Sequence, residues 1–145
     1  YVFTRSKGNI MNTQDLAIRF SEINSYQGYD FDTQLIPGDS DVLQIVVTDY
    51  EEIPVYISIT ETQILCISYL WSEDEVVQDT RAEMLELMLE INIPMPLSAF
   101  SKIGEQYVIF GALMANSSFE DIVHEVITLA ENSVEAISAI KDFLK

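Results

Sequence analysis

Alternating apolar residues fill the middle of the chain, where residues 42–71 read VLQIVVTDYEEIPVYISITETQILCISYLW. In the first run, Leu43, Ile45 and Val47 alternate with their neighbours, which is the period of a strand buried on one face. Polar connections separate the runs, and short connections favour antiparallel neighbours. Strands are therefore predicted at residues 42–48, 55–60 and 64–71.

The last of these runs carries the single cysteine of the chain. Strict alternation assigns its residues to two faces: Leu65, Ile67, Tyr69 and Trp71 on one, and Ile64, Cys66, Ser68 and Leu70 on the other. A reactive thiol needs a cationic neighbour or a helix start, and Cys66 has neither nearby in sequence, so a structural cysteine is predicted. One cysteine also excludes a disulfide scaffold.

The flanking sequence adds further strands and three helices. Residues 29–35 alternate in the same way, and residues 100–103 and 106–114 form a hairpin around Gly104-Glu105. Helices are predicted at residues 13–23, across residues 84–91, and from Ser117 almost to the end. The predicted fold is α+β, with one antiparallel sheet and helices packed on it, in the order α-ββββ-α-ββ-α.

Capping residues mark where the helices begin. Asn12 with Asp15 reads as a capping box for the first helix. For the second helix, Ser72-x-x-Glu75 and Thr80-x-x-Glu83 both fit, so its start is left open between them. For the third helix, Ser117-x-x-Glu120 reads as a capping box. Within it, the polar pair Asn132-Ser133 is where a kink or break is allowed.

The second helix is apolar around most of its circumference, a pattern typical of deep burial. The apolar residues are Met84, Leu85, Leu87, Met88, Leu89 and Ile91. We expect Leu89→Ala to cost about 2–5 kcal/mol, the usual penalty for a buried leucine. The helix ends before Pro94, and the two prolines of Ile93-Pro94-Met95-Pro96-Leu97 predict an extended connector.

The charge is strongly negative. The 145 residues include 24 acidic and 7 basic ones, a net charge of −17, and no Lys or Arg occurs from Phe20 to Thr80. Such a surface repels phosphate backbones and anionic lipids, so neither nucleic acid nor membrane insertion is predicted. The longest apolar stretch, Tyr107 to Ala115, is also far below the roughly 20 residues that span a bilayer. A partner with a basic surface is predicted instead, with solubility alone as the other reading of the charge.

The first residues differ from the rest. Tyr1 to Ile10 contain no acid and two of the seven bases, Arg5 and Lys7. We interpret residues 12–145 as a single acidic α+β domain and residues 1–11 as a non-native or upstream extension, with Met11 as the natural start. The extension is expected to be dispensable for folding.

No residue pattern predicts catalysis, a cofactor or a metal site. His124, the only histidine, lies beside acids and lacks companion zinc ligands, so a surface or boundary position is expected. The pairs Asp30/Asp32 and Asp39/Asp41 fail the calcium-loop template, because Leu35 stands where glycine is required.

Partner contacts are predicted at three residues. Tyr56 and Trp71 could form an aromatic surface with Tyr69, although strand aromatics more often belong to the core. Met95, held between two prolines, could be presented outward, with a plain connector as the alternative.

Two segments resemble a known family. Residues 93–100, IPMPLSAF, and 104–113, GEQYVIFGAL, resemble the YjfI family of small bacterial cytoplasmic proteins of unknown function. The resemblance extends from about Met11 to the end and implies no activity or catalytic residue. It implies a partner related to the membrane-stress protein PspA, because family members are often encoded beside such a homologue.

The order of elements resembles the type III secretion chaperone-like fold, whose members are small, acidic and usually dimeric; this allows a homodimer. The leading hypothesis is a cytoplasmic, non-enzymatic protein-interaction module, chaperone-like or regulatory, that binds a basic partner surface. The alternative is an enzyme or small-ligand-binding protein whose site is built from dispersed carboxylates. A mimic of nucleic acid is also compatible with the charge.

Overall fold

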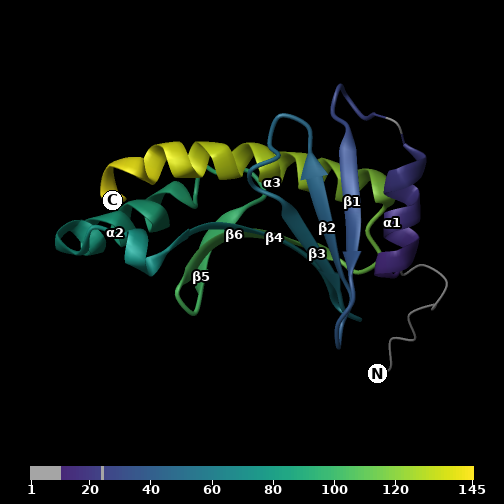
Figure 1. Cartoon of the computed structure of the whole chain (residues 1–145), viewed down its shortest axis with the longest axis horizontal. Helices are drawn as coiled ribbons and strands as arrows, with labels where there is room; N and C mark the ends of the chain where they lie inside the picture. The colour runs from purple at the N-terminus through teal and green to yellow at the C-terminus, as the bar shows by residue number, and fades with distance from the viewer. Residues whose placement is uncertain (1–10, 24) are drawn as a thin grey trace.

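A computed structural model of the chain describes residues 11–23 and 25–145 (Figure 1). The regular elements are α1 (Thr13–Glu22), β1 (Phe31–Ile36), β2 (Val42–Val47), β3 (Val55–Ile59), β4 (Gln63–Ser72), the 3₁₀ turns η2 (Glu73–Glu75) and η3 (Gln78–Thr80), α2 (Arg81–Ile91), β5 (Ala99–Ile103), β6 (Gln106–Met114), α3 (Phe119–Ile140) and η4 (Lys141–Phe143). This order confirms the predicted α-ββββ-α-ββ-α arrangement.

The strands form one six-stranded sheet in the order β1-β2-β3-β4-β6-β5. All neighbouring strands are antiparallel, and short connections account for this in every pair except β4–β6. The first four strands form a meander, and the β5–β6 hairpin joins it through the long pairing of β6 with β4. Gly104, with φ +56°, permits the tight turn of this hairpin.

The helices share one face of the sheet, which we call the inner face. Figure 1 shows α1 beside β1 at one end of the molecule, α2 at the opposite end, and α3 running along the length between them. The ring of Phe20 on α1 lies edge-on to Phe119 on α3, 5.0 Å between centroids, and to Phe31 on β1, 5.3 Å away. Met84 and Met88 of α2 belong to the same buried cluster.

Alternation along the strands produces this core. Leu43, Ile45 and Val47 of β2 are almost fully buried, and Val55 and Ile57 of β3 lie beside them. Their sequence neighbours point to the opposite side, which we call the outer face. In the part of the chain that the structure describes, no helix packs on the outer face.

A bulge in β4 changes the predicted faces of that strand. Ile64, Cys66 and Ser68 are buried toward the helices, but the register shifts between Tyr69 and Trp71. The extra residue turns Trp71 inward, where it is 3% exposed, while Tyr69 stays outside. The prediction that Trp71 shares a face with Tyr69 was therefore wrong.

Helix α2 is less buried than its composition suggested. Met84 and Met88 are buried, whereas Leu89 is 70% exposed and the following Ile93 is 89% exposed. Leu85, Leu87 and Ile91 pack against the core only in part, because the helix covers only the end of the sheet. The predicted deep burial of Leu89 was wrong, so the cost assigned to Leu89→Ala loses its structural basis.

The helix caps match the sequence only in part. The Asn12–Asp15 capping box is present at α1. Ser72 caps the 3₁₀ turn η2, and Thr80 precedes α2 without any side-chain cap bond. At α3 the capping residue is Ser118 instead of Ser117, because the Ser118 hydroxyl accepts a hydrogen bond from the Asp121 amide at 3.1 Å.

The connector after α2 and the middle of α3 both differ from the prediction. Residues 92–97 form turns and bends instead of an extended segment, and the Met95 amide donates to the Ile91 carbonyl at 3.2 Å. Helix α3 continues through the Asn132-Ser133 pair without a break. The Ser133 hydroxyl donates to the Leu129 carbonyl at 2.7 Å, which satisfies it inside the helix.

The proposed extension of residues 1–11 falls almost wholly outside the described part of the chain, which begins at Met11. Met11 is half-buried and packs against the core, just before the cap of α1. The predicted boundary between extension and domain stays a prediction.

Candidate functional site

The outer face of the sheet is an open apolar surface with a hollow at its centre. Its volume is about 310 Å³, and its walls come from four different strands. The lining residues are Val42, Tyr56, Ser58, Leu65, Ile67, Tyr69 and Ile103. Ile103 lies on β5 and Val42 on β2, so the sheet must curl for both to line one hollow. The outer face is therefore concave.

Aromatic and aliphatic side chains supply most of this concave surface. The Tyr56 and Tyr69 rings meet edge-on with centroids 5.8 Å apart, and Tyr69 is 47% exposed. Val108, which pairs with Tyr69 across the strands, is 1% exposed although it lies outside the inner core cluster. A half-exposed apolar surface of this kind is typical of a protein-binding site.

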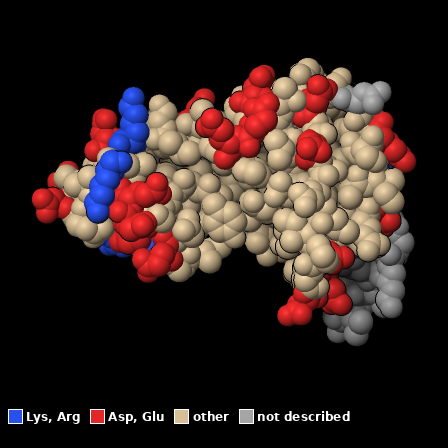
Figure 2. Space-filling view, viewed as in Figure 1, with Lys and Arg blue, Asp and Glu red and all other residues tan. Residues whose placement is uncertain are grey.

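Acidic residues border the outer face at the strand ends. At one end the β1–β2 and β3–β4 turns carry Asp39, Asp41 and Glu61, and at the other the β2–β3 turn carries Asp49, Glu51 and Glu52. Asp32 on β1 is an acid whose side chain points outward from within a strand. On the side drawn in Figure 2, acidic side chains lie toward the ends and margins and the middle is neutral.

Three of the basic residues in the described part of the chain have their contacts away from this border. Arg81 forms a salt bridge with Glu73, Arg19 lies 4.9 Å above the Phe119 ring, and Lys102 lies 5.5 Å above the Tyr107 ring. None of these three contacts involves an acid of the border, which therefore keeps a negative character that can attract a positive partner.

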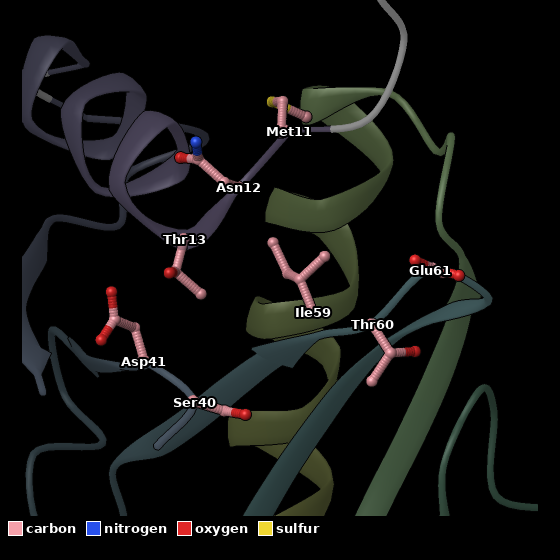
Figure 3. A pocket seen from close by; sticks show the side chains of 8 residues that line it. All are labelled: Met11, Asn12, Thr13, Ser40, Asp41, Ile59, Thr60 and Glu61. Atoms are coloured by element: carbon pink, nitrogen blue, oxygen red, sulfur yellow. The ribbon is translucent and has the colours of Figure 1, made fainter. Parts of the chain in front are cut away.

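A second hollow, of about 420 Å³, lies between the start of α1 and two turns of the sheet (Figure 3). Figure 3 shows Thr13, Ile59 and Asp41 around the space between the helix and the turns, with Glu61 at its margin. Hydroxyl and carboxylate oxygens beside apolar carbon could accept hydrogen bonds from a cationic group. Sequence reasoning missed this site, because its residues come from a helix start and two turns that are far apart in the sequence.

Met95 lies in a shallow depression between the connector and α3, of about 310 Å³. The side chain is half-buried against the core, so it is not presented outward as predicted. Of the three predicted contact residues, the structure puts Tyr56 on the outer face, Trp71 in the core, and Met95 at this separate site. Trp71 is too buried to contact a partner, while contacts by Tyr56 and Met95 stay predictions.

Glu73, Arg81 and Tyr107 form the strongest polar cluster at the α2 end. The Glu73 carboxylate accepts hydrogen bonds from the Arg81 guanidinium and from the Tyr107 hydroxyl. The Tyr107 hydrogen bond and the Arg81 charge lower the pKa of Glu73, and burial with the same hydrogen bond raises the pKa of Tyr107 to about 12. Such a paired set fixes η2 against α2 and β6, and leaves no free base or nucleophile.

Glu125 on α3 is a buried acid that sequence reasoning missed. It is 2% exposed, faces the sheet, and its Oε1 atom has no hydrogen-bond partner among the described residues. Burial raises the pKa of Glu125 to about 7. Two signals in the sequence could have indicated it: an acid within the apolar stripe of a helix, and Gly111 inside a strand.

The remaining candidates occupy the expected kinds of position. Cys66 is buried, and burial together with nearby Glu125 raises the pKa of its thiol, which suits a structural role. His124 is exposed on α3, and Asp30 and Asp32 are exposed at β1. Within residues 11–23 and 25–145, no group of three or more His, Cys, Asp or Glu side chains could hold a metal ion.

The fold and the open face define a class of small α+β proteins with a one-sided, curled sheet. The chain belongs to a particular family within it, described as "Uncharacterized protein conserved in bacteria (DUF2170)", whose model matches residues 10–144. It is 21% identical over 110 residues to "Uncharacterized protein YjfI" of Escherichia coli strain K12, covering 74% of this chain and 83% of that protein. The protein of the same name from Escherichia coli O157:H7 matches equally. The resemblance to YjfI is thus confirmed.

A solved structure shares the fold. It is the "Crystal Structure of the ExsC-ExsE Complex", with a TM-score of 0.54, 10% sequence identity, and coverage of 85% of this chain and 92% of that chain. This confirms the resemblance to the type III secretion chaperone-like fold. In the described part of the chain, no helix combines the length and apolar character needed to cross a membrane.

Proposed function

We propose that this protein is a cytoplasmic protein-interaction module that binds a basic segment of a protein partner on the outer face of its sheet. One observation carries the proposal: the concave outer face is apolar, bordered by acids, and bare of helices among the described residues. Apolar contacts would supply affinity, and the acidic border would select and steer a positively charged partner.

The shared fold supports a chaperone-like or regulatory role, because the neighbour of known structure is a complex of two named proteins. A PspA-like protein is the first partner to test, on the strength of the gene neighbourhood typical of the resembled family. A homodimer belongs to the same proposal. The exposed Leu89 and Ile93 at the α2 end offer it an apolar surface outside the hollow.

The test compares two variants that place a new acid on half-exposed apolar residues. Tyr69→Glu alters the outer face, whereas Ile18→Glu alters the surface of α1, where Ile18 is 56% exposed. Binding to a purified PspA homologue, and to partners recovered by in-cell crosslinking, is measured by surface plasmon resonance after circular dichroism has confirmed folding. We expect Tyr69→Glu to weaken binding by about tenfold or more and Ile18→Glu to leave it unchanged.

Salt separates the apolar and electrostatic parts of the proposal. The association rate should fall steeply as the Debye length shrinks from about 10 Å at 0.1 M to about 3 Å at 1 M. A rate that does not depend on salt would contradict the role of the acidic border. Equal binding by the Tyr69→Glu and Ile18→Glu variants would contradict the outer face as the site.

A further inference from the structure

A carboxyl group is enclosed between α3, the sheet and the connector that follows α2. Glu125 lies on the same side of α3 as Ile122 and Leu129, both fully buried, so its side chain points at the sheet. Its Oε1 atom lacks a partner within the described residues. A buried carboxylate without a partner is costly, and such a group usually takes up a proton instead.

Gly111 on β6 provides the space for this carboxyl group. A Cβ atom at position 111 would lie 1.8 Å from Glu125 Oε1 and 2.9 Å from the Leu97 main-chain oxygen. The carboxyl and the Leu97 carbonyl therefore approach the same point above Gly111. Two bare acceptors would repel one another there, whereas a protonated carboxyl can donate a hydrogen bond to the carbonyl.

The Leu97 carbonyl belongs to a constrained segment. Leu97 has a left-handed backbone, with φ +65°, which is unfavourable for leucine unless its surroundings hold it. Asn132, two turns after Glu125 on α3, donates to the Pro96 carbonyl at 2.8 Å and to the Ser98 hydroxyl at 3.0 Å. The connector is thus fixed to α3 on either side of Leu97. Glu125 approaches the main-chain oxygen of Leu97, which lies between these two hydrogen-bonded positions.

Few other titratable groups face Glu125. On β4, Cys66 pairs with Gly111, and its thiol pKa is raised by burial and by Glu125 itself. The connector, residues 92–98, contains none, and at this point β6 contributes only Gly111. On α3 the adjacent His124 is exposed. Within the described residues, no salt bridge to Glu125 is found, so burial governs its protonation.

We propose that Glu125 is a protonation switch: its protonated carboxyl donates a hydrogen bond to the Leu97 carbonyl and holds the connector of residues 92–98 on α3, and loss of the proton loosens that connector. This inference is independent of the partner proposed above. It implies a pH-sensitive region beside the exposed Ile93 and Leu97, away from the outer-face hollow.

The direction of the pH effect follows from the raised pKa. The folded protein keeps the proton up to about pH 7, whereas the unfolded chain releases it near the ordinary value. The stabilisation is fully present below the ordinary glutamate pKa of about 4.3 and is lost as pH rises through about 7. Across that interval the contribution to the unfolding equilibrium constant changes by up to about tenfold per pH unit.

The test is a carbon-13 NMR titration of the Glu125 carboxyl in the whole protein. We expect a midpoint near neutral pH, with the Ser98 amide and the Asn132 side-chain amide shifting at the same midpoint. A midpoint in the ordinary range near about 4.3, or unmoved Ser98 and Asn132 signals, would overturn the proposal. This measurement does not depend on a variant that folds.

Urea unfolding as a function of pH gives a second readout. Glu125→Gln keeps the size of the side chain and a donor group but cannot titrate, so it should remove the local pH dependence while preserving the connector. Glu135→Gln, an exposed position on the same helix, is the matched control and should keep the wild-type slope. Equal slopes for the wild type and Glu125→Gln would contradict the switch.

Discussion

At the residue scale, Met84 and Leu89 lie on the same helix, α2, but differ strongly in how far they are buried. Met84 is fully buried and Leu89 is 70% exposed. We predict that Met84→Ala lowers the free energy of unfolding by about 2–5 kcal/mol, because it leaves a cavity. Leu89→Ala should change it by less than about 0.5 kcal/mol. Urea unfolding of the two variants, monitored by tryptophan fluorescence, makes the comparison. A large loss for Leu89→Ala would mean that this surface is covered in solution.

Gly111 makes a second prediction, because the position has no room for a methyl group. A Cβ atom there would overlap Glu125 Oε1 and crowd the Leu97 carbonyl. Gly111→Ala should therefore lower the free energy of unfolding by about 1–3 kcal/mol through overpacking. Gly38→Ala is the control, since the nearest atom to its Cβ would be 3.4 Å away. Similar thermal unfolding of the two variants would show that Glu125 moves aside at little cost.

At the element scale, the helix starts differ in how they are capped. Ser118 accepts the Asp121 amide at the start of α3, whereas Thr80 makes no cap bond to α2 and its hydroxyl lies 3.4 Å from the Val77 carbonyl. We predict that Ser118→Ala costs about 0.5–2 kcal/mol of stability. Thr80→Ala should cost clearly less in the same denaturant titration. The reverse order would place the effective cap of α2 at Thr80.

The strands were predicted well because burial on one face imposes a period of two on their residues. Leu43, Ile45 and Val47 fixed the register of β2 in this way. The period failed at Trp71, because a bulge adds one residue without any signature in the sequence. The same limit explains why an aromatic surface of Tyr56, Tyr69 and Trp71 was predicted and only the two tyrosines lie outside.

Helix α2 shows a different limit of sequence reasoning. Its apolar residues indicated burial on most sides, but the amount of burial depends on what lies beside the helix. At the end of the sheet only Met84 and Met88 are buried, while Leu85, Leu87 and Ile91 pack against the core in part. Periodicity identifies the apolar residues of a helix. It does not show how far the helix extends beyond the sheet against which it packs.

At the scale of the whole molecule, the net charge of −17 should weaken the folded state. Among the residues that the structure describes, one salt bridge is found, between Arg81 and Glu73. Repulsion among the acids therefore dominates the electrostatic free energy of the folded state. We predict that the urea midpoint rises with sodium chloride, as the Debye length falls from about 30 Å at 0.01 M to about 8 Å at 0.15 M. A midpoint that falls would mean that favourable ion pairs outweigh the repulsion.

The element order and the antiparallel sheet could be predicted from the sequence, whereas the candidate site could not. An apolar stripe on α3 shows that the helix covers something, but not that all three helices cover the same face. The hollow depends on the curl of the sheet, which brings Ile103 of β5 toward Val42 of β2. The hollow is lined by distant parts of the chain, so it has no local signal in the sequence.

The alternation of the strands also has a consequence for the divergence of relatives. In β2 the residues at 43, 45 and 47 determine folding, while Val42, Gln44 and Val46 face outward. Selection can therefore change the outward set without disturbing the core. Relatives with different partners should keep the first set apolar and vary the second.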